Sequence, residues 1–188
     1  MALEIAQLGQ PVLRQVAREV PVDVIVTEEF RRLLAEMADT LQQAQGAGLA
    51  GPQVFAGYRV FLALLPRGPE LENLTVEVFV NPRIAWASQE QDAAWEGCLS
   101  FPELQVLVRR PRGVRIEYLD HQAQPRILEL TGFAARVVQH EYDHLEGILT
   151  IDRAVSTHDI VKASELAAVR QHRGGVQAKP QAADQGPD

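Results

Sequence analysis

The chain is organised around the stretch Val137-Val138-Gln139-His140-Glu141-Tyr142-Asp143-His144-Leu145-Glu146-Gly147, which contains the pattern H-E-x-x-H. On an α-helix, residues four apart lie one above the other on the same face, so His140 and His144 can offer two imidazole nitrogens to one metal ion. Glu141 lies one step around the helix, within reach of a water on that metal. Two nitrogen ligands beside a carboxylate are what a hydrolytic metal site needs.

The alternative to a metal site is a polar helix face that carries two surface histidines. The flanking residues argue against it, because apolar side chains recur around the motif at helical spacing. They are Phe133, Ala134, Val137, Val138 and Leu145. The sequence therefore predicts a packed face, on which two histidines without a metal would be costly to bury.

Two histidines leave such a site incomplete, since catalytic metal sites usually have three protein ligands and one open position. The chain has a single cysteine, Cys98, which cannot form an intramolecular disulfide. Taken alone, this thiol reads as a small core residue. Beside H-E-x-x-H it becomes the candidate third ligand, and Gly97 before it permits a close approach. The alternative third ligands are the downstream His158 and Glu165.

The composition is that of an ordinary globular protein. The chain has 188 residues, of which 46% are apolar and 23% charged. We therefore expect one domain with a hydrophobic core. The net charge of −7 disfavours specific DNA binding, and we expect no membrane span because no apolar run is long enough. The first residues lack the features of a signal peptide. Together with the lone cysteine, this predicts a cytoplasmic protein.

Periodicity predicts an α+β fold, in which mostly antiparallel sheets pack around the central metal-binding helix, with one N-terminal and one C-terminal helix. Thr27 is the expected cap of the first long helix, which runs to about Ala44. Gly132 and Gly147 bound the metal helix. Strands are predicted at residues 58–65, 74–81, 104–109, 113–119 and 126–130. Pro82 confines the end of the second strand to an edge or a turn.

The domain is predicted to span residues 1–173, and residues 156–173 form its C-terminal helix. Residues 174–188 are rich in Gly, Ala, Gln, Pro and Asp and are expected to be a flexible tail.

A glycine-rich stretch, residues 46–53, follows the first long helix. It lacks the Lys and Ser/Thr of a phosphate-binding loop, and its simplest interpretation is a plain turn. Small residues also let a substrate backbone approach the chain closely. The amide of Gln53 can then donate a hydrogen bond to a developing oxyanion.

Three segments, in this order, resemble the motifs of the peptide deformylase (polypeptide deformylase) family. They are Gly46-Ala47-Gly48-Leu49-Ala50-Gly51-Pro52-Gln53, Glu96-Gly97-Cys98-Leu99-Ser100 and Gln139-His140-Glu141-Tyr142-Asp143-His144-Leu145. The resemblance covers roughly residues 1–155. One departure is Gly51, where the family usually has alanine. We expect this glycine to loosen the turn slightly while Gln53 keeps its position.

The resemblance implies a metal-dependent amide hydrolase. Its substrate would be the N-formyl group on the initiator methionine of newly synthesised polypeptides, released as formate during N-terminal processing. Metal-bound hydroxide would attack the formyl carbon, with Glu141 as general base and then general acid. The Gln53 side chain and the backbone N–H of Leu99 would donate hydrogen bonds to the oxyanion.

The resemblance also assigns residues to substrate binding. Phe133 and Val137 match family positions in the pocket for the methionine side chain, and plain core packing is the alternative for both. The peptide backbone would lie extended and bond to Ala47, Gly48 and Gly97 as an added strand.

Three charged residues are candidates for supporting the metal ligands. Glu96 and Arg110 match a family ion pair that braces the cysteine loop, and a surface salt bridge of little energetic worth is the alternative. Asp143 is placed by the sequence to accept a hydrogen bond from a metal-bound histidine and so orient it.

The resemblance implies one divalent metal per chain. Fe²⁺ would be the ion in the cell, and Ni²⁺, Co²⁺ or Zn²⁺ could occupy the site in purified protein, because the ligands themselves do not select iron. It further implies docking at the ribosome through the C-terminal helix, whose basic residues are Lys162, Arg170 and Arg173.

Two rival functions stay open at the level of sequence. A zinc metallopeptidase would share H-E-x-x-H and take His158 or Glu165 as its third ligand instead of Cys98. A non-catalytic, metal-stabilised binding module would need neither Glu141 nor Gln53.

Overall fold

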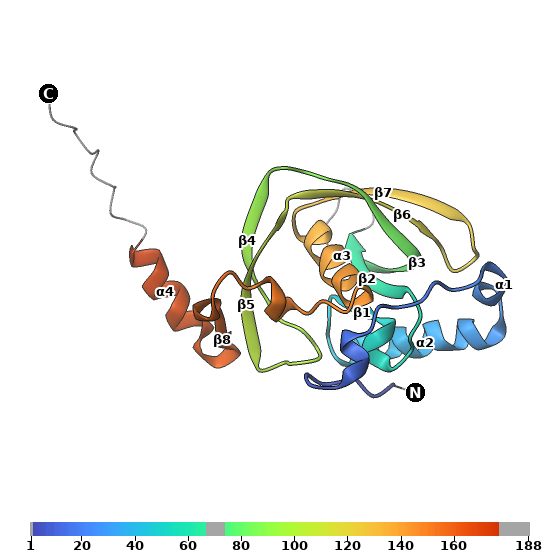
Figure 1. The fold of residues 1–188 in the computed structure, drawn as a ribbon, viewed down its shortest axis with the longest axis horizontal. Helices are drawn as coiled ribbons and strands as arrows, with labels where there is room; N and C mark the ends of the chain where they lie inside the picture. Colours follow the sequence, from blue (N-terminus) through green and yellow to red (C-terminus); the bar gives the residue numbers. More distant parts are fainter. Residues whose placement is uncertain (1, 67–73, 177–188) are drawn as a thin grey trace, which may run out of the picture.

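The computed structural model of the protein describes residues 2–66 and 74–176, with side chains through residue 172. Two antiparallel sheets form its body (Figure 1). The larger has the order β1-β2-β3-β6-β7 and the smaller β4-β5-β8. Their bounds are β1 Gly48–Ala50, β2 Val60–Pro66, β3 Leu74–Ala87, β4 Gln91–Glu96, β5 Leu104–Pro111, β6 Gly113–Leu119, β7 Pro125–Thr131 and β8 Ile160–Lys162. The predicted α+β architecture is confirmed.

The two long helices cover opposite faces of the large sheet. They are α2 (Glu28–Gln43) and α3 (Gly132–Leu145); α1 (Val22–Ile25) is short, and α4 (Leu166–Val176) follows β8. Successive side chains of a strand point to opposite faces, and β2 shows the consequence. Phe61 packs with the α3 residues Val137 and Val138, whereas Leu62 packs with the apolar stripe of α2.

The start of α2 and the end of α3 follow the sequence. Thr27 caps α2, and its Oγ1 accepts a hydrogen bond from the N–H of Phe30 at 3.2 Å. Gly147 lies just after α3 with φ +69°, the left-handed conformation that glycine adopts without strain. A Cβ at Gly147 would stand 2.6 Å from the carbonyl oxygen of Arg14, so the N-terminal segment packs directly against the end of the helix.

The long strand β3 continues through Pro82, where the sequence predicts an edge or a turn. The register shifts between Val80 and Arg83, which removes the proline from the ladder of hydrogen bonds. Asn81 takes φ +49°, and its side chain bonds to both the N–H and the C=O of Val20, at 2.8 and 2.9 Å.

The C-terminal helix begins later than predicted. Residues 157–159 form a 3-10 turn, and Ser156 accepts a hydrogen bond from the N–H of His158 at 3.2 Å. Ile160–Lys162 then pairs with β5 as β8, because two β-branched residues extend the sheet better than they extend a helix. Helix α4 starts at Leu166 and projects from the small sheet (Figure 1). The predicted tail lies, from residue 177 on, outside the described residues.

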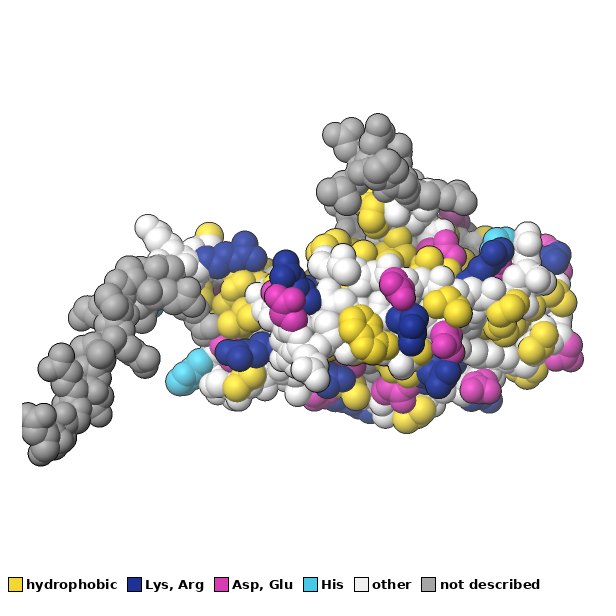
Figure 2. Space-filling view, turned by 90° about the horizontal axis from the view of Figure 1, so that it is seen from above, with side chains coloured by type: hydrophobic (Ala, Val, Ile, Leu, Met, Phe, Trp, Pro, Cys, Tyr) yellow, Lys and Arg dark blue, Asp and Glu magenta, His cyan; other side chains and the backbone are white. Residues whose placement is uncertain are grey.

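No helix within residues 2–66 and 74–176 is long and apolar enough to cross a membrane. The face in Figure 2 carries Lys and Arg side chains interspersed with Asp and Glu. Charges of both signs therefore lie side by side on this face.

Candidate metal centre

Three potential metal ligands meet near the C-terminal end of β4, a terminal strand of the small sheet. Cys98 comes from the loop after β4, and His140 and His144 come from one face of α3. Their ligand atoms all lie within 4.8 Å of one another, and Cys98 Sγ is 3.3 Å from His144 Nε2. The structure therefore brings together the three residues that the sequence singled out.

The chemistry of these donors fits a divalent metal ion. One thiol and two imidazoles suit zinc, iron and cobalt. The Nδ1 of His140 is taken by Glu96 Oε2 at 3.1 Å, which leaves Nε2 of His140 to act as a ligand. His158 and Glu165 are exposed, and neither belongs to a potential metal group in the described part of the chain.

Glu141 lies beside this group and is buried, with 4% of its surface exposed. Its Oε2 has no hydrogen-bond partner among the described residues. Burial raises the pKa of Glu141 to about 7, although the charges of His140 and Arg110 oppose the shift. A carboxyl group with a pKa near neutrality can both accept and return a proton. Gly48 stands so close to Glu141 that a Cβ there would be 2.4 Å from Oε1.

The amide of Gln53 is fixed in orientation. Its Oε1 accepts a hydrogen bond from the N–H of Ala50 at 2.9 Å, and its Nε2 lies 3.2 Å from Ser100 Oγ and 3.6 Å from Cys98 Sγ. With the oxygen held by the backbone, the NH₂ group faces the candidate metal ligands. At Gly51, a Cβ would lie 2.7 Å from the backbone oxygen of Tyr58, so the backbone packs closely around this position.

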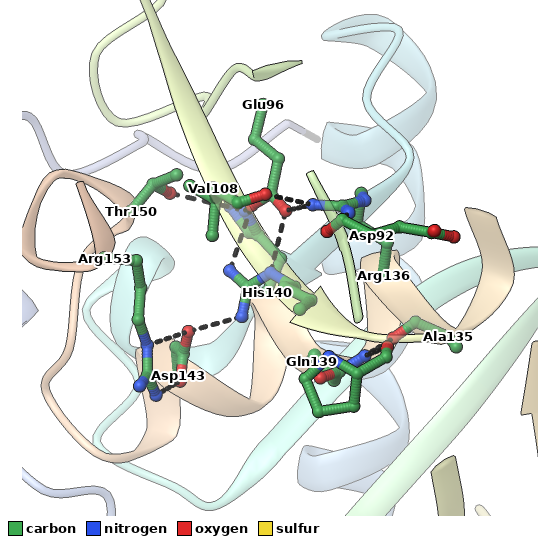
Figure 3. Close-up of polar contacts among 12 residues, drawn as sticks. Asp92, Glu96, Val108, Ala135, Arg136, Gln139, His140, Asp143, Thr150 and Arg153 are labelled. Carbon is green, nitrogen blue, oxygen red and sulfur yellow. Dashed lines mark hydrogen bonds and ion pairs between the residues drawn. The ribbon is translucent and has the colours of Figure 1, made fainter. Parts of the chain in front are cut away.

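The carboxylate of Glu96 orients His140, one of the candidate metal ligands (Figure 3). Arg110 holds it with two bonds, Nε to Oε1 at 2.7 Å and Nη2 to Oε2 at 2.9 Å. Burial raises the pKa of Glu96, but the hydrogen bonds from His140 and Arg110 lower it to about 2. The pair is buried rather than a surface salt bridge, with both side chains 5% exposed.

Asp143 does not take the orienting role that the sequence favoured. Its carboxylate accepts hydrogen bonds from Arg110 Nη1 at 2.8 Å and from both Nε and Nη2 of Arg153. Asp143 comes three residues after His140 on α3 and is its neighbour on the helix surface, but these two arginines take its carboxylate. It supports Arg110, which in turn supports Glu96.

A cavity of about 340 Å³ opens onto the candidate site. It brings together most of the residues predicted for catalysis and substrate binding: Ala47, Gly48, Gln53, Glu96, Gly97, Cys98, Leu99, Phe133, Val137, His140 and Glu141. Phe133 is 70% exposed, whereas Val137 is 6% exposed and part of the core. His144, Arg110 and Asp143 are absent from the lining.

Sequence reasoning missed three residues that line this cavity: Trp95, Pro102 and Arg136. Trp95 adjoins Glu96 in the chain, and Pro102 follows the cysteine motif. Arg136 carried a usable signal. It precedes His140 by four residues on a helix whose neighbouring positions are apolar, and an arginine on such a face needs a buried partner.

The chain is similar to known proteins over most of its length. A family model described as Polypeptide deformylase matches residues 2–159. Peptide deformylase 2 of Nostoc sp. is 38% identical over 166 residues, 87% of this chain and 92% of that protein. Peptide deformylase of Treponema pallidum is 41% identical over 151 residues, 80% of this chain and 87% of that protein.

Solved structures of peptide deformylases are also similar to this chain in fold. A class I type b peptide deformylase from Acinetobacter baumannii, bound to Met-Ala-Ser, aligns with a TM-score of 0.75 at 33% identity, covering 81% of this chain and 98% of that one. Peptide deformylase from Thermotoga maritima aligns with a TM-score of 0.75 at 35% identity, covering 83% and 99%.

Proposed function

Since the chain belongs to the polypeptide deformylase family, we propose that it removes the N-formyl group from the initiator methionine of newly synthesised polypeptides and releases formate. The observation that carries this proposal is the convergence of Cys98, His140 and His144 with the buried Glu141 at one cavity. A non-catalytic metal module would gain nothing from burying an unpaired carboxylate there.

Cys98, His140 and His144 would hold one divalent metal, Fe²⁺ in the cell, with Ni²⁺, Co²⁺ or Zn²⁺ as substitutes in purified protein. When bound, such an ion supplies Lewis acidity, which polarises a carbonyl group and lowers the pKa of a water molecule to about 7. Glu96 would keep His140 in the orientation and tautomer that present Nε2.

Glu141 would carry the proton. Its carboxylate takes a proton from the attacking water and later gives it to the amine that leaves the formyl carbon, which is general base followed by general acid catalysis. The pKa of about 7 that burial produces supports both directions of transfer near neutral pH.

Gln53 and Leu99 would stabilise the oxyanion. The Gln53 NH₂ group already faces the candidate ligands, since its oxygen is held by Ala50. The N–H of Leu99, next to Cys98 in the chain, would be the second donor. Each such donor typically contributes about 10²- to 10³-fold in rate.

The substrate backbone would lie between two free strand edges. β1 and β4 are the terminal strands of their sheets, and both lead into residues that line the cavity. An extended peptide can add to such edges through main-chain hydrogen bonds, here at Ala47, Gly48 and Gly97. Phe133 and Val137 would contact the methionine side chain.

The proposal also covers where the enzyme works. A formylated chain emerges at the ribosome in the cytoplasm, and α4 projects from the small sheet where a partner can reach it (Figure 1). Arg170 is exposed on α4, and Lys162, which was predicted in the helix, is exposed at the end of β8 instead. Co-sedimentation with ribosomes that is unchanged after residues 163–188 are deleted would remove this part of the proposal.

The decisive experiment measures formate release from a formyl-Met peptide by anaerobically purified, metal-loaded protein. We expect release by the parent and by Glu129→Ala, which changes an exposed glutamate of β7, and none by Glu141→Ala. No release by the parent would overturn the proposal. Cleavage of unformylated peptides that survives Cys98→Ala would instead identify the rival zinc metallopeptidase.

A further inference from the structure

Arg136 is a buried arginine of α3 to which the proposed reaction gives no role. Its side chain is 11% exposed and lines the cavity. It stands four residues before His140, so both side chains leave the same face of the helix. A guanidinium group is costly to bury unless its charge and its N–H groups are paired, and its partners therefore show what it holds in place.

Those partners all belong to the small sheet. Nη1 of Arg136 donates to Glu96 Oε1 at 2.6 Å and to the carbonyl oxygen of Val108 at 3.1 Å. Nη2 donates to the carbonyl oxygen of Asp92 at 2.7 Å. Asp92 and Glu96 lie on β4, and Val108 lies on β5. One side chain thus ties α3 to two strands at once (Figure 3).

Two arginines hold Glu96, and they connect it to α3 in different ways. Arg110 lies on β5, which already pairs with β4, so its two bonds to Glu96 lie within the small sheet, and it reaches α3 through a separate bond from Nη1 to Asp143 at 2.8 Å. Arg136 lies on α3, the helix that carries His140. Its bond therefore fixes the carboxylate relative to the imidazole whose Nδ1 is 3.1 Å from Glu96 Oε2.

The same connection spans the ligand group. Cys98 follows β4 by two residues, and His140 and His144 lie on α3. The distance between the cysteine and the histidines therefore depends on how the helix sits against the end of β4. The three hydrogen bonds of Arg136 act at that junction.

We propose that Arg136 is a positioning residue for the metal ligands: it locks α3 to β4 and holds Glu96 where it orients His140. The inference rests on the proposed function only in taking His140 as a ligand. Arg136 also lines the cavity, so the test must separate positioning from contact with the substrate.

The test compares two substitutions at this position with a control. Arg136→Met keeps the apolar stem and removes the charge, and Arg136→Lys keeps a charge that can donate to Glu96 but cannot also reach both carbonyls. The control is Arg59→Gln, which breaks a half-buried ion pair with Glu146, 2.6 Å long, at the far end of α3. Dissociation constants for Co²⁺ and the visible absorption of the cobalt forms are measured first, then kcat and KM at saturating Co²⁺.

We expect Arg136→Met to weaken Co²⁺ binding about 10- to 100-fold, the usual cost of losing an outer partner of a metal ligand. The cobalt absorption changes because its intensity follows ligand geometry, kcat falls, and KM stays within about threefold of the parent. Arg136→Lys recovers part of the affinity, and Arg59→Gln leaves it unchanged.

The proposal would be overturned if Arg136→Met kept the Co²⁺ affinity and the absorption of the parent and changed only KM. Arg136 would then be a residue that merely lines the cavity. If that variant does not fold, Arg136→Lys decides: parental affinity and kcat in the lysine variant overturn the proposal. Equal loss of affinity in Arg59→Gln also overturns it. If the parent releases no formate, the proposed function is refuted. The comparison of Co²⁺ affinities among the variants still tests whether Arg136 positions the metal ligands.

Discussion

Replacing Gly48 by alanine is expected to displace the carboxylate of Glu141. A Cβ at Gly48 would lie 2.4 Å from Glu141 Oε1, 2.6 Å from Cγ and 2.7 Å from Cδ. Ordinary van der Waals contact begins at 3.4 Å. The glutamate is buried on α3 and Gly48 is paired in β1 with Ala63, so the side chain, not the strand, must retreat by about 1 Å.

A displacement of this size has a known order of cost. A catalytic group misplaced by about 1 Å typically loses about 10²-fold in rate, which corresponds to about 2.7 kcal/mol of activation free energy. We therefore expect kcat/KM of Gly48→Ala for a formyl-Met peptide to fall about 100-fold. The metal content should equal that of the parent, because Glu141 is outside the Cys98 group. Formate release and elemental analysis measure the two quantities.

Gly57→Ala is the matched control, since a Cβ at Gly57 meets nothing within 4 Å. It should retain parental kcat/KM. Activity of Gly48→Ala within about threefold of the parent would show that Glu141 relaxes without loss, and the geometric reasoning would be refuted. A loss of activity that merely tracks a loss of metal would refute it as well, because the damage would then lie in the ligand group.

Three further changes have expected outcomes. Cys98→Ala should abolish stoichiometric metal binding, measured by elemental analysis, because two imidazoles remain where three ligands are needed. Gly147→Ala should lower the free energy of unfolding in urea by about 1–3 kcal/mol, since φ is +69° and Arg14 leaves no space for a Cβ. Burial raises the pKa of Asp120, but hydrogen bonds from its own turn, led by the N–H of Gln124, lower it below its usual value. Asp120→Asn should therefore have a lower free energy of unfolding than the parent at pH 7. This difference should shrink as pH falls below about 4, where the parent carboxylate takes up its proton. A difference that stays constant in urea unfolding from pH 7 to 3 would contradict this prediction.

The features that the sequence predicted correctly depend on neighbours in the chain. The two histidines of α3 are four residues apart, and the apolar stripe around them has the period of a helix. The cap at Thr27 needs only the N–H three residues later. In β2, apolar residues suffice to indicate a buried strand because both faces are covered, one by α2 and one by α3.

The missed strands depend on partners far along the chain. β4 reads Gln91-Asp92-Ala93-Ala94-Trp95-Glu96, without alternation of polar and apolar residues, and it forms because β5 offers six register partners. β8 has three residues and pairs with Leu104–Val106, more than fifty positions earlier. Local propensity cannot anticipate such pairings, because their stability comes from the tertiary contacts themselves.

The buried charges between α3 and the small sheet were predicted only in part from the sequence, and their arrangement explains why. Glu96 and Arg110 were found by resemblance, but the function of the pair becomes clear only when Arg136 closes the network from α3. Buried ion pairs contribute little to stability compared with apolar packing, so this cluster is poorly explained as a source of stability. The apolar stripe of α3 already secures the helix against the large sheet, yet apolar contacts tolerate small shifts. Directional bonds between α3 and β4 supply what packing does not: a fixed position of the histidines relative to the cysteine. On this reasoning, substitutions in the cluster should impair metal geometry more than they impair folding, whereas substitutions in the stripe should do the reverse.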